Sequence, residues 1–124
     1  MSEPLFVGFD TSNYTTSAAV CDADGEVLLN ARTLLPVREG ERGLRQSDAV
    51  FFHVRNLPDL LGQVRETVRG RVVRAVGCSV SPRRAEGSYM PCFLSGIMAA
   101  EAFAAAIDVP VLRFAHQEGH IMAA

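Results

Sequence analysis

Residues 5–22 read LFVGFDTSNYTTSAAVCD, and this stretch decides the fold. The apolar run over 5–9 ends at Asp10 and is followed by four polar, turn-prone residues, which predicts a strand that enters a tight loop. Residues 15–22 are rich in small and β-branched side chains, which is typical of a second strand. The chain is therefore expected to open with two antiparallel strands joined by a short polar loop.

A third extended segment at 26–35 follows the turn signal DADG, so the first three strands should form a meander. The charged residues 36–47 include two glycines and predict a loop. From Asp48 onward the apolar residues recur at helical spacing, which predicts a helix that stops at Gly70. Pro58 is expected to kink or break this helix. The predicted inward face of this helix is Val50, Val54, Leu57, Leu61, Val64 and Val68.

The rest of the chain alternates between strands and helices. A buried strand is predicted over 72–80, a polar loop over 81–91, a second helix after it, a last strand over 110–114 and a third helix at the end. The order β-β-β-α-β-α-β-α predicts an α/β fold with a mixed sheet and helices on its faces, joined by right-handed crossovers. The predicted inward positions of the second helix are Phe93, Ile97, Ala100, Ala104 and Ile107.

Size and composition indicate one soluble domain of 124 residues with 48% hydrophobic residues. No apolar run approaches the roughly 20 residues of a membrane span, and the N-terminus lacks a basic region before an apolar core. Three cysteines without a C-x-x-C pair are expected to be reduced core or near-core thiols. We therefore expect a cytoplasmic protein that does not contact a membrane.

All twelve basic residues are arginine, and the net charge of −2 excludes a global attraction to nucleic acid. A local cluster of arginines remains an alternative to a solvated helix face, which we favour. The arginines concerned are Arg65, Arg69, Arg71, Arg74, Arg83 and Arg84.

The two histidines His116 and His120 stand four residues apart, so on a helix they share one face and can hold one metal ion. Alternatively, the two histidines belong to a solvated terminus and bind no metal. Glu118 lies two residues after the first histidine, roughly 200° around a helix, and so cannot act as the base of an H-E-x-x-H protease. A catalytic metal needs a third protein ligand, and we expect the chain to be the front part of a longer enzyme.

Residues 8–17, GFDTSNYTTS, together with 116–120, HQEGH, resemble the tRNA threonylcarbamoyladenosine transferase family, which older names call glycoprotease or O-sialoglycoprotein endopeptidase. The resemblance implies that residues 1–124 form an N-terminal RNase H-like half-domain of the actin-like ATPase fold. It covers about the first third to two-fifths of a full-length member, so the second half-domain would be absent.

The resemblance also implies a set of site residues. His116 and His120 would bind a divalent metal or iron, with zinc and iron as the favoured ions, while the family's distant aspartate ligand has no counterpart here. Asp10, Thr11 and Ser12 would face the nucleotide cleft, where ATP or threonylcarbamoyl-adenylate would bind only in the complete protein. No catalytic residue is assigned, and the helical His53 is interpreted as a packing or surface residue.

The leading hypothesis is an N-terminal fragment of a metal-dependent threonylcarbamoyl transferase that modifies tRNA, inactive as an isolated fragment. The loop over 81–91 lacks the family's Gly-Pro-Gly turn, which suggests a paralogous branch. The alternative is a non-catalytic subunit that pairs with a related subunit, and a metalloprotease ranks last. A homodimer is also expected, through apolar surface at Phe114, Ile121 and Met122.

Overall fold

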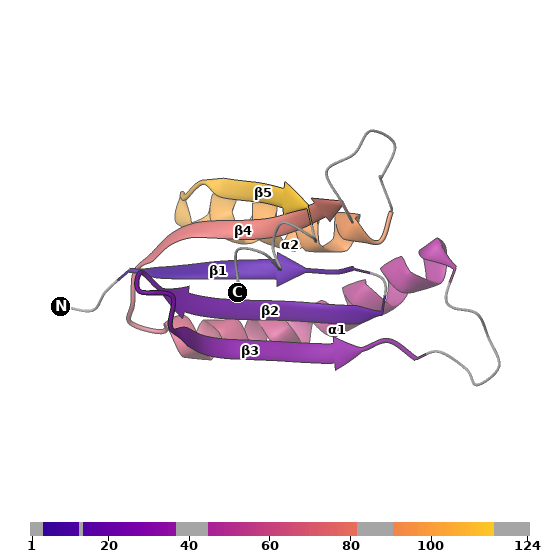
Figure 1. The fold of residues 1–124 in the computed structure, drawn as a ribbon, viewed down its shortest axis with the longest axis horizontal. Coiled ribbons are helices and arrows are strands. Elements are labelled where there is room, and N and C mark those ends of the chain that lie inside the picture. Colours follow the sequence, from indigo (N-terminus) through magenta and orange to yellow (C-terminus); the bar gives the residue numbers. More distant parts are fainter. Residues whose placement is uncertain (1–3, 13, 37–44, 82–90, 116–124) are drawn as a thin grey trace.

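The computed structural model describes residues 4–12, 14–36, 45–81 and 91–115 (Figure 1). The predicted order of strands and helices is confirmed as far as the fifth strand, and the helix expected after that strand lies outside the described residues. The elements are β1 (Leu5–Asp10), β2 (Thr15–Asp22), β3 (Val27–Leu34), α1 (Gln46–Val68), β4 (Val73–Ser81), α2 (Phe93–Ile107) and β5 (Val111–Ala115).

The five strands form one sheet in the order β3-β2-β1-β4-β5. The pairs β1–β2 and β2–β3 are antiparallel, whereas β1–β4 and β4–β5 are parallel. The predicted meander and helical crossovers are therefore confirmed. Because β1, β4 and β5 run in the same direction, they end at one edge of the sheet, at Asp10, Ser81 and Ala115. We call this edge the carboxyl edge.

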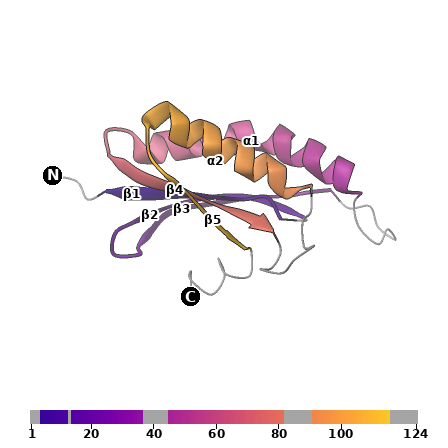
Figure 2. The same ribbon diagram turned by 90° about the horizontal axis from the view of Figure 1, so that it is seen from above.

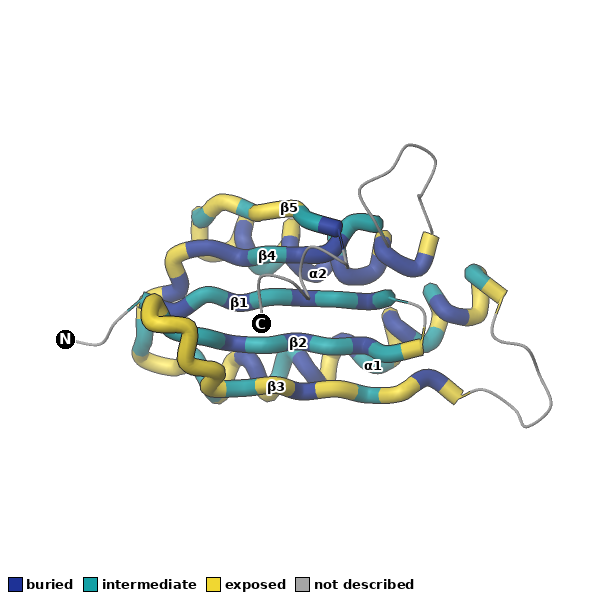
Figure 3. Tube along the Cα trace, viewed as in Figure 1, coloured by how far each residue is buried: buried dark blue, intermediate teal, exposed yellow. Residues whose placement is uncertain are grey.

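Both described helices lie on the same face of the sheet, as the view from above shows (Figure 2). Helix α1 packs on β2 and β3, and α2 packs mainly on β4 and β1. Burial alternates along β1 and β2, because successive side chains point to opposite faces of a strand (Figure 3). The core consequently lies between this face and the two helices.

The centre of the core is formed by β1, whose inward side chains are Leu5, Val7 and Phe9. The ring of Phe9 meets the ring of Phe103 from α2 edge to face, with centroids 6.2 Å apart. Leu60 and other buried side chains of α1 complete the same cluster. A strand buried in this way holds its carboxyl end, and the turn that follows, in a fixed position relative to both helices.

The inward face of α1 differs from the prediction by a rotation of the helix. Val54 is 56% exposed, although it was expected to be buried, and His53 is fully buried in its place. His53 faces the sheet because its ring makes a polar contact there. The prediction counted only apolar residues, so it could not include a histidine on the buried face. The buried positions of α1 are Ala49, His53, Leu57, Leu60 and Val64.

Pro58 does not break α1, which runs as one helix from Gln46 to Val68. The proline has no N–H to donate to the carbonyl of Val54 four residues earlier. Both residues are exposed, so that carbonyl lies on the side of the helix that faces water. Of the two expected outcomes, a kink or a break, the break into two pieces is therefore wrong.

Helix α2 confirms the expected close packing of small residues, because Gly96, Ala99, Ala100 and Ala104 are all buried. Ile107 was expected to point inward but is 43% exposed. The helix stops at Asp108, which adopts a left-handed conformation with φ of 57°. Ile107 is the last residue of α2, at the point where the chain ends the helix and turns toward β5.

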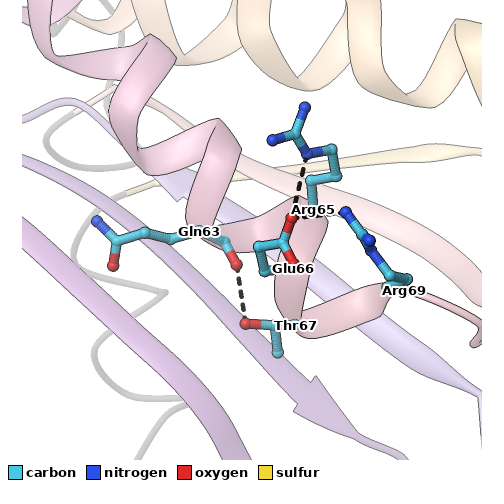
Figure 4. A network of polar contacts seen from close by, with 5 residues as sticks. All are labelled: Gln63, Arg65, Glu66, Thr67 and Arg69. Carbon is cyan, nitrogen blue, oxygen red and sulfur yellow. Dashed lines mark hydrogen bonds and ion pairs between the residues drawn. The ribbon is translucent and has the colours of Figure 1, made fainter.

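Arg65 and Arg69, at the end of α1, lie on a solvated helix face, as favoured above. Arg71 and Arg74 come after the helix, and Arg83 and Arg84 lie outside the described residues. Arg69 and Arg65 both approach the carboxylate of Glu66, at N···O distances of 2.7 Å and 3.6 Å (Figure 4). Thr67 donates a hydrogen bond to the carbonyl of Gln63 in the same group. The charged side chains are exposed, so such ion pairs contribute little to stability.

Candidate functional site

The candidate site starts at the carboxyl edge, where β1 ends at Asp10. The backbone N–H of Ser12 donates to Oδ1 of Asp10 over 2.9 Å, and the N–H of Thr15 donates to the carbonyl of Ser12 over 3.1 Å. Ser17 on the neighbouring strand donates from its hydroxyl to the carbonyl of Asp10 over 3.2 Å. A carboxylate that accepts a hydrogen bond two residues on is typical of aspartate in tight turns. The predicted residues Asp10 and Ser12 are thus held together in one turn, and both are half-buried.

Thr11 points the opposite way, into the protein. Its hydroxyl donates to the carbonyl of Cys92 over 2.9 Å and accepts the N–H of Gly96 over 2.9 Å. The side chain is fully buried. Both partners lie in the first turn of α2, so Thr11 joins the end of β1 to the beginning of this helix.

The first turn of α2 has further partners inside the protein. The N–H of Cys92 donates to Oε1 of Gln46, the first residue of α1, over 3.1 Å. The N–H of Leu94 donates to the carbonyl of Pro91 over 3.0 Å. The side chains of Thr11, which follows β1, and of Gln46 accept the N–H groups of Gly96 and Cys92 at this end of the helix. These N–H groups are consequently engaged in packing the helix rather than turned toward a ligand.

The second part of the predicted site follows β5. Ala115, the last residue of β5, is paired with Ser81 at the end of β4 and is buried. The next residue in the sequence is His116, but His116 and His120 lie outside the described residues. Ile121 and Met122, expected at a dimer contact, also lie outside them, whereas Phe114 is half-buried with its ring against Gly77. The structure therefore places Ala115, the residue before His116, at the carboxyl edge.

Within residues 4–12, 14–36, 45–81 and 91–115, no three His, Cys, Asp or Glu side chains lie close enough together to hold a metal ion. In the same part of the chain, no helix is long and apolar enough to cross a membrane.

A buried polar contact that sequence reasoning missed links α1 to β2. Oγ1 of Thr16 lies 2.8 Å from Nδ1 of His53, and Nδ2 of Asn56 donates to the same Oγ1 over 3.1 Å. Thr16 and His53 are both fully buried. The only signal in the sequence was a histidine within the predicted helix, and a pattern of apolar residues does not include it. The contact fixes α1 beside the strand that leaves the Asp10 turn.

The cysteines have the environment expected of structural thiols. Cys78 and Cys92 are buried, Cys21 is half-buried, and none of the three forms a disulfide. Burial raises the pKa of the Cys78 thiol, an effect that nearby Arg113 opposes and Glu101 reinforces. Burial and the charge of Asp22 likewise raise the pKa of Cys21. Since the thiolate is the nucleophilic form, neither residue is suited to covalent catalysis at neutral pH.

No protein-family model matches the chain, and the comparison with curated proteins gives no significant match. Solved structures do match. YeaZ from Pseudomonas aeruginosa is similar with a TM-score of 0.61 and 19% identity, over 90% of this chain and 44% of that chain. An uncharacterised protein with similarity to peptidase YeaZ, also from Pseudomonas aeruginosa, gives a TM-score of 0.59 and 18% identity, over 90% of this chain and 43% of that one.

A third match is RuvC from Thermus thermophilus in complex with a Holliday junction substrate. Its TM-score is 0.52 at 13% identity, over 93% of this chain and 66% of that chain. The chain spans less than half the length of the two YeaZ-like structures. At these identities the likeness concerns the fold. The chain has an α/β fold of the RNase H-like type, with a mixed five-stranded sheet.

Proposed function

We propose that this chain is the N-terminal half-domain of a metal-dependent transferase of the threonylcarbamoyl type, which acts on tRNA in its complete form. One observation carries the proposal. The Asp10 turn and the end of β5, directly before His116, both belong to the carboxyl edge of the same parallel strands. Ligands of open α/β sheets bind outside the carboxyl ends of the strands.

The proposed division of labour follows from the chemistry of the groups. His116 and His120 would hold one metal ion, zinc or iron, which supplies Lewis-acid polarisation of a carbamoyl group when bound. Asp10 and Ser12 would present a carboxylate and a hydroxyl to the ligand beside it. ATP or an adenylate would need a second half-domain to close the other side of the cleft.

Metal uptake tests this proposal directly. Isothermal titration of the chain with Zn²⁺ or Ni²⁺ should show one weak site, because two imidazoles supply at most half of a tetrahedral shell. The double variant His116→Ala, His120→Ala should lose this uptake, while Cys21→Ala, which removes a partly exposed thiol, should retain it. Equal uptake by the chain and the double variant would remove the metal site from the proposal.

A second candidate function, pairing with a related subunit or a second copy, is favoured by the outer surface of the helices. Phe51 and Val54 on α1 are 60% and 56% exposed, and Leu94 and Met98 on α2 are 47% and 68% exposed. The two helices touch through the buried cluster that contains Phe93 and Ala49, so their outer surfaces are neighbours. Contiguous exposed apolar patches of more than a few hundred Å² mark association surfaces, and these four side chains would belong to such a patch.

Light scattering over a dilution series tests this second candidate. Met98→Glu should shift the chain toward the monomer, whereas Val27→Glu, at an equally exposed apolar residue of β3, should not. Ile121→Asp separates this surface from a contact through the C-terminal residues. Dissociation by Ile121→Asp alone would assign the contact to that end, and a monomer at all concentrations would argue against both surfaces.

A further inference from the structure

The residue whose role the structure redefines is Thr11. A threonine hydroxyl carries one hydrogen and two lone pairs. The hydrogen of Thr11 is given to the carbonyl of Cys92, and one lone pair accepts the N–H of Gly96, both over 2.9 Å. With its side chain fully buried, Thr11 has no hydrogen left to donate to a phosphate or carboxylate oxygen of a ligand.

We infer that Thr11 is a positioning residue, which holds the turn of Asp10 and Ser12 against the first turn of α2 and does not contact the ligand itself. The inference rests on the proposed function, because that proposal supplies the ligand that Asp10 and Ser12 would face. Asp10 and Ser12 flank Thr11 in the chain and are joined to each other by the N–H of Ser12. Anchoring Thr11 between them therefore fixes the direction of both ligand-facing groups.

The helix side of the contact is equally specific. A Cβ atom on Gly96 would lie 2.8 Å from Oγ1 and 3.4 Å from Cγ2 of Thr11. A separation of 2.8 Å is too short for a methyl group, so with any larger residue either α2 or the Thr11 side chain would have to shift. Gly62 in α1 is the matched contrast, because a Cβ atom there meets nothing within 4 Å.

The contact also restricts how a ligand can use this edge. The N–H of Gly96 is bound to Thr11, and the N–H of Cys92 is bound to Gln46. A helix N-terminus binds a phosphate through free N–H groups, and these two are engaged. These two N–H groups are therefore not available to a ligand.

Amide hydrogen exchange on the whole chain, followed by NMR, tests the inference at the Ser12 N–H. Thr11→Val keeps the shape of the side chain but loses both hydrogen bonds, each worth about 1 kcal/mol, so exchange at Ser12 should accelerate about tenfold or more. Thr11→Ser keeps the hydroxyl and should restore protection. The N–H of Gly25, bonded to the carbonyl of Asp22 at the opposite edge, serves as reference and should not change.

Gly96→Ala disturbs the same contact from the helix side and should also accelerate exchange at Ser12, while Gly62→Ala should not. This pair carries the test if Thr11→Val does not fold. Unchanged protection of Ser12 in both Thr11→Val and Gly96→Ala would overturn the inference. Metal uptake by the histidine pair is measured separately, so failure of the proposed function would leave the exchange result interpretable.

Discussion

Nδ1 of His53 lies 2.8 Å from Oγ1 of Thr16, and both side chains are fully excluded from water. The pair links the middle of α1 to β2, 37 residues apart in sequence. Asn56, one helical turn after His53, donates to the same hydroxyl. This buried polar contact therefore fixes the rotation of α1 on the sheet.

Replacing Thr16 with valine should lower the free energy of unfolding by about 1–3 kcal/mol, because buried polar partners in α1 lose the hydroxyl they contact. Urea unfolding followed by circular dichroism measures the change. Thr67→Val is the matched control, since the hydroxyl of Thr67 is exposed and bonds only within its own helix. Equal stability of the two variants would show that the buried contact does not stabilise the fold.

Replacing Pro58 with alanine should raise the free energy of unfolding by about 1–2 kcal/mol. The substitution restores a helical N–H and removes a ring that crowds the preceding turn, and a more flexible unfolded chain offsets part of the gain. Pro110 lies outside the helices, so Pro110→Ala should be neutral or slightly destabilising. A loss of stability in Pro58→Ala would mean that α1 depends on the shape that proline imposes.

Stability should decline on the alkaline side because burial raises the pKa of Cys78. An unfolded thiol ionises near pH ~8.5, so the contribution of the buried neutral thiol is complete below this value and is lost as the pH rises through the folded pKa. The chain has no lysine to titrate in the same range. Urea unfolding between pH 7 and 9.5 should show this decline, and Cys78→Ala should reduce it. A decline of the same size in that variant would assign it to other groups.

Saturable micromolar binding of ATP is not expected for the isolated chain, because the carboxyl edge offers only one side of a two-sided cleft. Fluorescence titration with a labelled nucleotide would measure it. Asp10→Asn is the informative variant if binding does occur. Micromolar binding that Asp10→Asn leaves unchanged would contradict the role given to the turn.

The order of strands and helices along the chain could be predicted, because apolar periods and turn signals leave few alternatives. The rotation of α1 could not, since it depends on a polar contact between His53 and Thr16 that no apolar pattern contains. The inward direction of the Thr11 side chain could not be predicted for a similar reason. Its partners Cys92 and Gly96 lie more than eighty residues away in the chain, and a short motif shows only that the residue is polar.

The central claim, that the histidine pair and the Asp10 turn share the carboxyl edge, is tested most directly by paramagnetic broadening of amide signals. Co²⁺ bound to His116 and His120 should broaden the signals of Ser12 and Ser81 but spare Gly25. Gly25 lies in the turn between β2 and β3, beside the start of β1, so the length of β1, about 20 Å, separates it from the carboxyl edge. The double variant His116→Ala, His120→Ala should show no broadening at these positions. Broadening of Gly25 with Ser12 unaffected, or the same pattern in the double variant, would contradict the account.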